Sequence, residues 1–169
     1  MAELEALKRL MHPNIIKLYE IIDDPVMPNL YLVMDIITGG TIEDRIKETT
    51  DGLNEELLWK WTRQISSAVY YCHNVANICH RDLKAENVML SKTDDAILVD
   101  FGVSACFNGE NDKVHGTEGS IKYFAPEIVR TGVKKIIHAR RTDVWALGVT
   151  FYNMATNKFP FYAQSLSGM

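Results

Sequence analysis

The stretch His80-Arg81-Asp82-Leu83-Lys84-Ala85-Glu86-Asn87 is followed along the chain by Asp100-Phe101-Gly102. Together they contain the groups that phosphoryl transfer needs: a carboxylate to orient a hydroxyl, an amine to meet a phosphate, and oxygen ligands for a divalent metal. Ala125-Pro126-Glu127 comes next, after a loop-like segment. Taken singly, such an aspartate could be a turn former, the lysine a surface charge and the asparagine a helix cap. Their combination at these spacings favours a catalytic site over those ordinary roles.

These motifs resemble the catalytic loop and the metal-binding tripeptide of eukaryotic protein kinases. The resemblance implies that Asp82 accepts or orients the proton of a substrate hydroxyl and that Lys84 reaches the transferring phosphate. It implies ATP and Mg²⁺ as cofactors, with Asn87 and Asp100 as metal ligands that also bind the nucleotide. The HRDLKxxN form is similar to that of serine/threonine kinases, so we expect protein substrates with serine or threonine acceptors.

The resemblance also implies a nucleotide pocket beside this loop. Met34 falls where a residue guards the back of the pocket, and the backbones of Asp35 and Ile37 would meet the adenine edge. Met89 would form the adenine floor, although an apolar strand residue is by default part of the core. Thr41 departs from many relatives, which place an acidic residue there to bind ribose.

Several polar residues have regulatory roles in this interpretation. Arg81 could pair with a phosphate on the activation loop, which implies an upstream activating kinase as a partner. Thr117 is the favoured phosphosite, with Ser104 and Ser120 as alternatives. Ser120 matches a hydroxyl that ties the peptide-binding loop to the catalytic loop; otherwise it is a loop serine bonded to its own backbone.

Two further expectations concern the interior. Leu7, Leu18, His80 and Phe101 fall at the positions of the family's stacked internal spine. Asp143 opens the expected buried helix and would accept backbone hydrogens near His80 and Arg81.

Periodicity and turn signals predict an α+β arrangement. Asn54 is expected to cap one helix, and residues 103–124 are expected to be a loop. The expected helices are 2–11, 42–47, 55–73 and 142–155, and the expected strands are 15–22, 30–37, 87–90 and 97–99.

The composition is that of a globular protein, with 169 residues, 47% hydrophobic and 24% charged. A net charge of −4 gives no reason to expect nucleic acid or membrane binding, and no apolar run approaches the roughly 20 residues that span a bilayer. The three cysteines lack metal-ligand spacing, so buried reduced thiols and an intracellular, cytoplasmic location are expected. The basic run 130–141 is expected to be a solvated insertion or, alternatively, a docking patch for an acidic partner.

The resemblance implies a protein kinase-like fold in which part of the domain is missing. Residues 1–37 would be a remnant of the small lobe and hinge, with the end of one helix and two strands, and residues 38–169 most of the helical large lobe. Glu3 matches the helix glutamate whose partner lysine, like the glycine-rich phosphate loop, would precede this chain. We therefore expect little activity from the chain alone; the alternative is a non-catalytic, pseudokinase-like interaction module. Within the family, residues 19–25 and 143–150 are similar to calcium/calmodulin-dependent kinase kinases and related upstream kinases.

Overall fold

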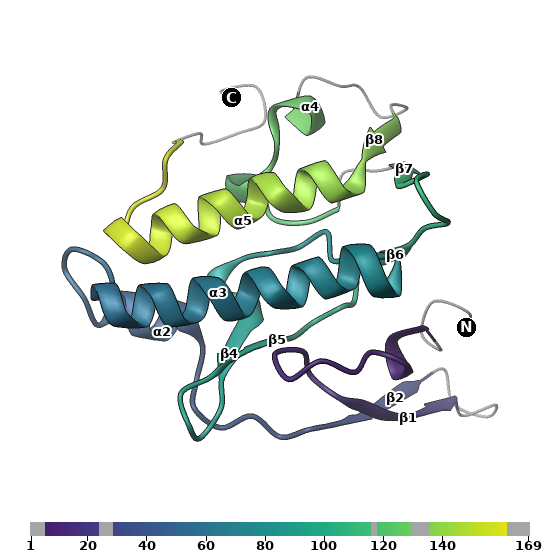
Figure 1. Ribbon diagram of the computed structural model, residues 1–169, viewed down its shortest axis with the longest axis horizontal. Helices are drawn as coiled ribbons and strands as arrows, with labels where there is room; N and C mark the ends of the chain where they lie inside the picture. The colour runs from purple at the N-terminus through teal and green to yellow at the C-terminus, as the bar shows by residue number, and fades with distance from the viewer. Residues whose placement is uncertain (1–5, 24–28, 116–117, 130–135, 162–169) are drawn as a thin grey trace.

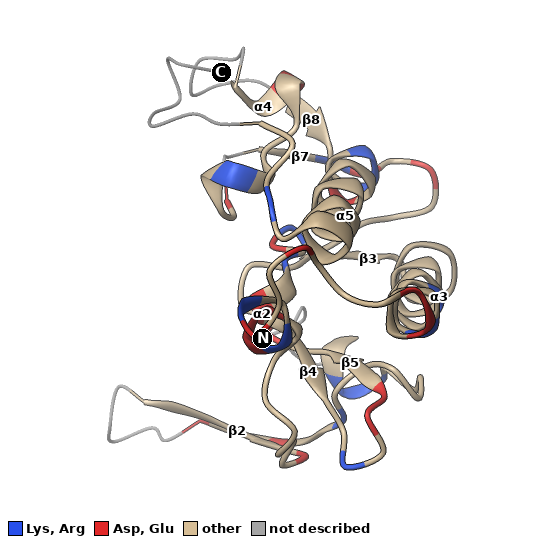
Figure 2. Cartoon of the chain, turned by 90° about the vertical axis from the view of Figure 1, so that its left-hand side faces the viewer, with Lys and Arg blue, Asp and Glu red and all other residues tan. Residues whose placement is uncertain are grey.

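The computed structural model describes residues 6–23, 29–115, 118–129 and 136–161. A hairpin, β1 (Leu18–Asp23) with β2 (Leu30–Met34), lies at one end of the molecule, and β7, β8 and α4 lie at the other (Figure 1). Figure 2 shows the same order from the side, with α2, β4 and β5 in between. Mixed helices and short strands in this arrangement confirm the α+β expectation.

The first strands are shorter than the sequence predicts. Ile15 lies outside β1 and instead forms an isolated parallel bridge with Leu98, which ties the N-terminal segment to β5 (Ala96–Leu98). β2 ends at Met34, so residues 35–37 are an irregular connection rather than strand. Of the expected helix 2–11, residues 6–8 are helical, and residues 1–5 lie outside the described part.

The helices after residue 41 confirm the periodicity argument. α2 spans Ile42–Lys47, and α3 spans Glu55–Tyr71, followed by a π-helical turn, Cys72–Ala76. The side chain of Asn54 caps α3 by accepting a hydrogen bond from the backbone N–H of Leu57 at 3.0 Å. α3 lies alongside the 18-residue helix α5 (Ala139–Thr156) in both ribbon views.

Three further two-stranded sheets are small. β4 (Val88–Leu90) pairs with β5, β3 (Ile78–Cys79) with β6 (Ala105–Cys106), and β7 (Lys113–His115) with β8 (Ile136–His138), all antiparallel. The expectation of a plain loop over 103–124 is therefore wrong, because two strands form there through partners distant in sequence. Asn87 closes a short 3₁₀ turn before β4 instead of starting the strand, and α4 spans Pro126–Val129.

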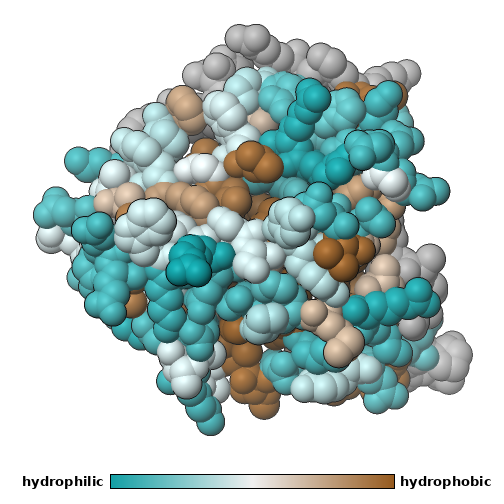
Figure 3. All heavy atoms as spheres, viewed as in Figure 1, coloured by the Kyte–Doolittle hydropathy of each residue, from teal (hydrophilic) through white to brown (hydrophobic). Residues whose placement is uncertain are grey.

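The main core lies between α3, α5 and the β4–β5 pair. Its fully buried side chains include Trp61, Ile65, Leu90 and Met154. A smaller cluster joins Phe124, Ala125, Ile128 and Ile137. The face in Figure 3 is mostly hydrophilic or neutral, with apolar side chains in separate small patches. No helix among the described residues has the length and apolar character needed to cross a bilayer.

Two surface expectations need correction. Cys72 and Cys79 are buried, but Cys106 is exposed, because β6 is a two-residue strand with little cover. The basic run is not simply solvated in its described part: Ile137 is buried and Arg140 belongs to α5. Residues 130–135 lie outside the described residues.

Candidate active site

The first residues of the candidate catalytic loop are held by the buried carboxylate of Asp143. Asp143 accepts hydrogen bonds from the backbone N–H groups of His80 and Arg81, each at 2.8 Å, and contacts His73 Nε2 at 2.8 Å. The expected backbone anchor is thus confirmed. α5 begins at Ala139, however, so Asp143 lies in its second turn and does not open the helix. Arg81 itself has a left-handed backbone, φ 69°, which these hydrogen bonds help to hold.

The expected internal spine is buried along its length. Leu7, Leu18, His80 and Phe101 are all at most 9% exposed. The rings of His80 and Phe101 lie 4.7 Å apart, and His80 Nε2 is 2.9 Å from the Val99 carbonyl oxygen. Burial lowers the pKa of His80, while the charges of Asp143, Asp82 and Asp100 act in the opposite direction. Both candidate site carboxylates are therefore close enough to this ring to affect it.

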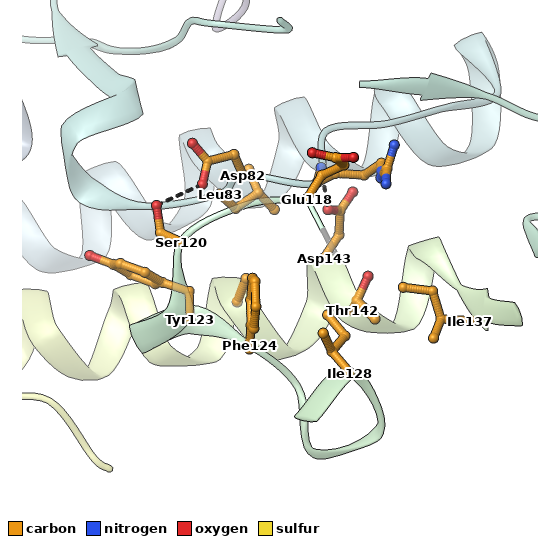
Figure 4. Close-up of a pocket in the computed structure, with 12 residues that line it drawn as sticks. Asp82, Leu83, Glu118, Ser120, Tyr123, Phe124, Ile128, Ile137, Thr142 and Asp143 are labelled. Atoms are coloured by element: carbon orange, nitrogen blue, oxygen red, sulfur yellow. Dashed lines mark hydrogen bonds between the residues drawn. The ribbon is translucent and has the colours of Figure 1, made fainter. Parts of the chain in front are cut away.

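Asp82 lies at the centre of a compact polar network. Its Oδ2 accepts hydrogen bonds from Lys84 Nζ at 2.6 Å and from the Asn87 amide at 3.0 Å, and its Oδ1 accepts one from Ser120 Oγ at 3.0 Å. Lys84 Nζ also donates to Ser120 Oγ at 2.9 Å. Figure 4 shows the side chains of Asp82 and Ser120 pointing toward each other, while Asp143 rises from α5. The Ser120 side chain therefore contacts Asp82 and Lys84, as the interpretation as a tie to this loop expects, rather than its own backbone.

These contacts determine the charge of Asp82. Burial alone would raise its pKa, but hydrogen bonds from Lys84, Ser120 and Asn87, with the Lys84 charge, hold the pKa below its ordinary value. The carboxylate is consequently ionised at neutral pH and can accept a hydrogen bond from a hydroxyl.

A backbone hydrogen bond brings the segments that carry Asn87 and Asp100 together. The N–H of Val99 donates to the Asn87 carbonyl at 2.9 Å, which places Asp100 one residue beyond this contact. Asp100 is exposed, has φ 59°, and accepts from the Gly102 N–H at 3.2 Å through Oδ1. The Asn87 side-chain N–H groups donate to the carbonyl oxygen and to Oδ2 of Asp82, and no donor among the described residues reaches its amide oxygen. Carboxylate and amide oxygens are hard ligands, so this donor set fits Mg²⁺.

A largely apolar cavity of about 390 Å³ lies beside Asp100. It brings together all the residues expected around adenine, because the segment after β2 runs past β4: Gly39 N–H donates to the Leu90 carbonyl at 2.9 Å. The lining includes Met34, Asp35, Ile37, Met89, Leu18, Asp100 and Phe101. Its apolar walls suit a flat base, and Asp100 at the edge could meet the attached phosphates through a divalent metal ion.

Asp82 lines a different, much smaller cavity of about 20 Å³, shown in Figure 4. Arg81, Glu118, Ser120 and Thr142 also line it. Lys84, Asn87 and Ser120 engage both carboxylate oxygens of Asp82, so little open space is left beside it.

The regulatory residues are only partly within the described chain. Arg81 donates to the carbonyl oxygens of Val103 at 3.3 Å and His115 at 3.4 Å, so its guanidinium contacts the start of the segment 103–124 and a residue two positions before Thr117. Thr117 and Glu3 lie outside the described residues.

Two sets of contacts were not indicated by residue spacing along the chain. His73, Cys79 and Asp143 come within 4.8 Å of one another although they show no ligand spacing along the chain. Asp143 already receives hydrogen bonds on both oxygens, so this group is explained as a structural anchor. Asp112, a buried carboxylate in the expected loop, was also missed; its sequence context is that of an ordinary turn.

Comparison with known proteins agrees with this geometry. A model described as "Protein kinase domain" matches residues 1–168. The chain is 35% identical to a calcium/calmodulin-dependent protein kinase kinase of Caenorhabditis elegans over 94% of this chain and 29% of the relative. It is 38% identical to the SNF-related serine/threonine-protein kinase of Homo sapiens, over 94% of this chain and 20% of the relative. The chain thus spans less than a third of the length of these curated relatives. It belongs to the protein kinase domain family.

Proposed function

We propose that the chain carries the catalytic loop and part of the nucleotide pocket of a serine/threonine protein kinase. The observation that supports this best is the Asp82 carboxylate, ionised and oriented by Lys84, Asn87 and Ser120. In this proposal residues 1–37 belong to the small lobe and connecting segment, and residues 38–169 to the large lobe.

The proposed reaction transfers the γ-phosphoryl group of ATP to a serine or threonine hydroxyl of a protein. The hydroxyl oxygen forms a bond to the γ-phosphorus, the bond from that phosphorus to the β–γ bridging oxygen breaks, and ADP leaves. Asp82 accepts the hydroxyl proton or holds it in a hydrogen bond, and Lys84 offsets charge on the transferred phosphate.

The cavity residues have complementary roles in this proposal. Met34 and Met89 enclose the base, and the backbones of Asp35 and Ile37 meet its polar edge. Asn87 and Asp100 would hold Mg²⁺, which when bound neutralises charge on the phosphate oxygens. Arg81, with an upstream kinase acting on the segment that contains Thr117, would regulate the site.

The test is phosphate transfer from radiolabelled ATP to a serine/threonine peptide mixture, with wild type compared with Asp82→Asn. The assay is run on the 169-residue chain and on any longer product of its gene. Asp82→Asn should lower transfer by roughly 100-fold or more, because it removes the proton acceptor. Asp51→Asn, which changes an exposed aspartate in the loop after α2, is the matched control and should transfer as wild type does. Equal transfer by Asp82→Asn and wild type would contradict the assignment.

A non-catalytic interaction module is the second candidate, favoured by the exposed hairpin: all five residues of β2 are exposed, and all are apolar or aromatic. This second candidate is supported if no product of the gene transfers phosphate while the folded protein still captures a protein partner through β2. A Val33→Lys change on that strand should then abolish capture.

A further inference from the structure

The N-terminus of α5 is capped from a distant part of the chain. The residue before the helix, His138, makes no side-chain hydrogen bond to the first turn. Instead, the carbonyl of Asp112 accepts from the Ala139 N–H at 3.0 Å, and Asp112 Oδ2 accepts from the Arg140 N–H at 3.0 Å. The first backbone N–H groups of a helix have no partner within the helix, and a carboxylate there is favoured by the helix dipole.

Asp112 is also held by the side chains around it. Its Oδ1 lies 2.7 Å from His138 Nδ1, and its Oδ2 lies 3.4 Å from Arg140 Nε. The Asp112 residue is only 3% exposed. Burial raises its pKa, but hydrogen bonds from His138 and from the Arg140 N–H, with the Arg140 charge, outweigh this and leave the pKa below its ordinary value. The cap is therefore charged at neutral pH.

Residues before Asp112 also contact the side chain of Arg140. The Arg140 guanidinium lies over the Phe107 ring at 5.0 Å and donates to the Glu110 carbonyl at 3.2 Å. The residues after Asp112 form β7, which pairs with β8 immediately before α5. The whole stretch from Phe107 to His115 is thus fastened to one helix end.

The same helix fastens the catalytic loop. Asp143, three residues beyond Arg140, accepts the backbone N–H groups of His80 and Arg81. Arg81 in turn donates to His115, the last residue of β7. The contacts close a ring: Asp112 to α5, α5 to Arg81, and Arg81 back to the strand that follows Asp112.

We propose that Asp112 is a positioning residue that docks the segment 107–115 on α5 and so keeps His115 in place against Arg81. Asp112 holds this segment through contacts between protein groups alone, and a phosphate on the segment is not needed for them. The structural part of this inference stands on the contacts above; its consequence for phosphate transfer rests on the proposed function.

Hydrogen–deuterium exchange with mass spectrometry tests the docking on the folded chain. Asp112→Ala should speed the exchange of amides 113–115 and 139–141 about 5- to 30-fold, which is the usual effect of losing a cap, while α3 stays protected. Asp112→Asn should recover most of the protection, since an asparagine side chain also accepts at a helix N-terminus. Glu110→Ala is the matched control: its exposed carboxylate pairs with the same Arg140 at 3.6 Å, and exchange should stay as in wild type.

Unchanged exchange in Asp112→Ala at both segments would overturn the inference. If α3 also loses protection in Asp112→Ala, Asp112→Asn decides. Full protection of α3, with at most a small loss confined to 113–115 and 139–141, supports the docking role, and a loss that still includes α3 overturns it. In a product that transfers phosphate, kcat/KM should fall in Asp112→Ala, by at most about the same 5- to 30-fold factor, and recover in Asp112→Asn. A wild type without transfer but with the expected exchange pattern would count against the proposed function and leave the docking role supported.

Discussion

The cysteine side chains differ sharply in their surroundings. Burial, with the Asp143 charge, raises the pKa of Cys72 to about 12, and burial with the charges of Asp143 and Asp112 raises the pKa of Cys79 still further. Cys106 is exposed at the edge of β6. Because the thiolate is the reactive form, location alone should decide which cysteine reacts.

We expect iodoacetamide at pH ~8 to modify Cys106 at least on the order of 100-fold faster than Cys72 or Cys79 in the folded protein. Peptide mapping by mass spectrometry measures the three rates, and in strong denaturant they should become similar. Equal rates in the folded chain would contradict the burial of Cys72 and Cys79.

The lowered pKa of Asp95 makes the stability of the folded protein depend on pH. Hydrogen bonds from Thr93, Gln64 and Lys60 lower its pKa from 3.8 to about 2. A lowered carboxyl pKa stabilises the folded state above the unfolded pKa, and this contribution is lost as pH falls through the folded value. Its side chain is 38% exposed, so solvent screens the effect.

We therefore expect urea unfolding midpoints to fall less steeply between pH ~4 and ~2 in Asp95→Asn than in wild type. Asp51→Asn, an exposed aspartate outside this network, should keep the wild-type slope. The same slope in Asp95→Asn and wild type would show that the folded-state hydrogen bonds do not retain the charge.

At the scale of elements, the loop between α2 and α3 is fitted closely to the end of α5. Leu53 N–H donates to the Met154 carbonyl at 2.8 Å, and Asn157 Nδ2 donates to the Thr49 carbonyl at 2.8 Å. Gly52 has φ +99°, and a β-carbon there would collide with the Ala155 carbonyl. This position requires glycine for both its backbone angle and its lack of a side chain.

Gly52→Ala should lower the free energy of unfolding by more than about 2 kcal/mol, because strain and a backbone clash add. Gly109→Ala isolates the strain, since Gly109 has φ +58° with nothing within 4 Å of a β-carbon; about 1 kcal/mol is expected there. Denaturant unfolding of both variants measures the difference. Equal losses would mean that the loop moves away from α5 at no cost.

Elements with a period or a local cap were predictable from the sequence. α2 and α3 begin where predicted, because a polar cap precedes an apolar helical repeat in each. The short strands β3, β6, β7 and β8 were not predicted because their partners lie far along the chain, whereas the equally short β4 and β5 pair across a local turn. α5 starts three residues earlier than expected, since its cap is Asp112 and not a neighbouring residue.

In the candidate site, too, contacts within a local motif were predictable and contacts between distant segments were not. Asp82, Lys84 and Asn87 are close in sequence, so a local motif was sufficient to group them. The contacts of Asp112 with α5 and of His73 with Asp143 are created by the fold. No spacing rule within the chain could have indicated them.

On the scale of the whole molecule, Asp143 joins three separate parts. Its carboxylate, 1% exposed, connects α5 to the π-helical turn after α3 through His73, and to the candidate catalytic loop through the N–H groups of His80 and Arg81. A buried N–H that loses its acceptor costs about 1–3 kcal/mol. Removing the Asp143 carboxylate would therefore remove contacts from several elements at once.

Asp143→Ala should therefore lower the free energy of unfolding by about 3 kcal/mol or more, whereas Lys84→Ala, at a partly exposed side chain, should cost about 1 kcal/mol or less. Denaturant unfolding measures both. A double-mutant cycle of Asp143→Ala with His73→Ala should give a coupling of about 0.5–3 kcal/mol, because the side chains lie 2.8 Å apart. Additive losses would mean that the catalytic loop and the end of α3 are held to α5 independently, so that Asp143 is not their common anchor.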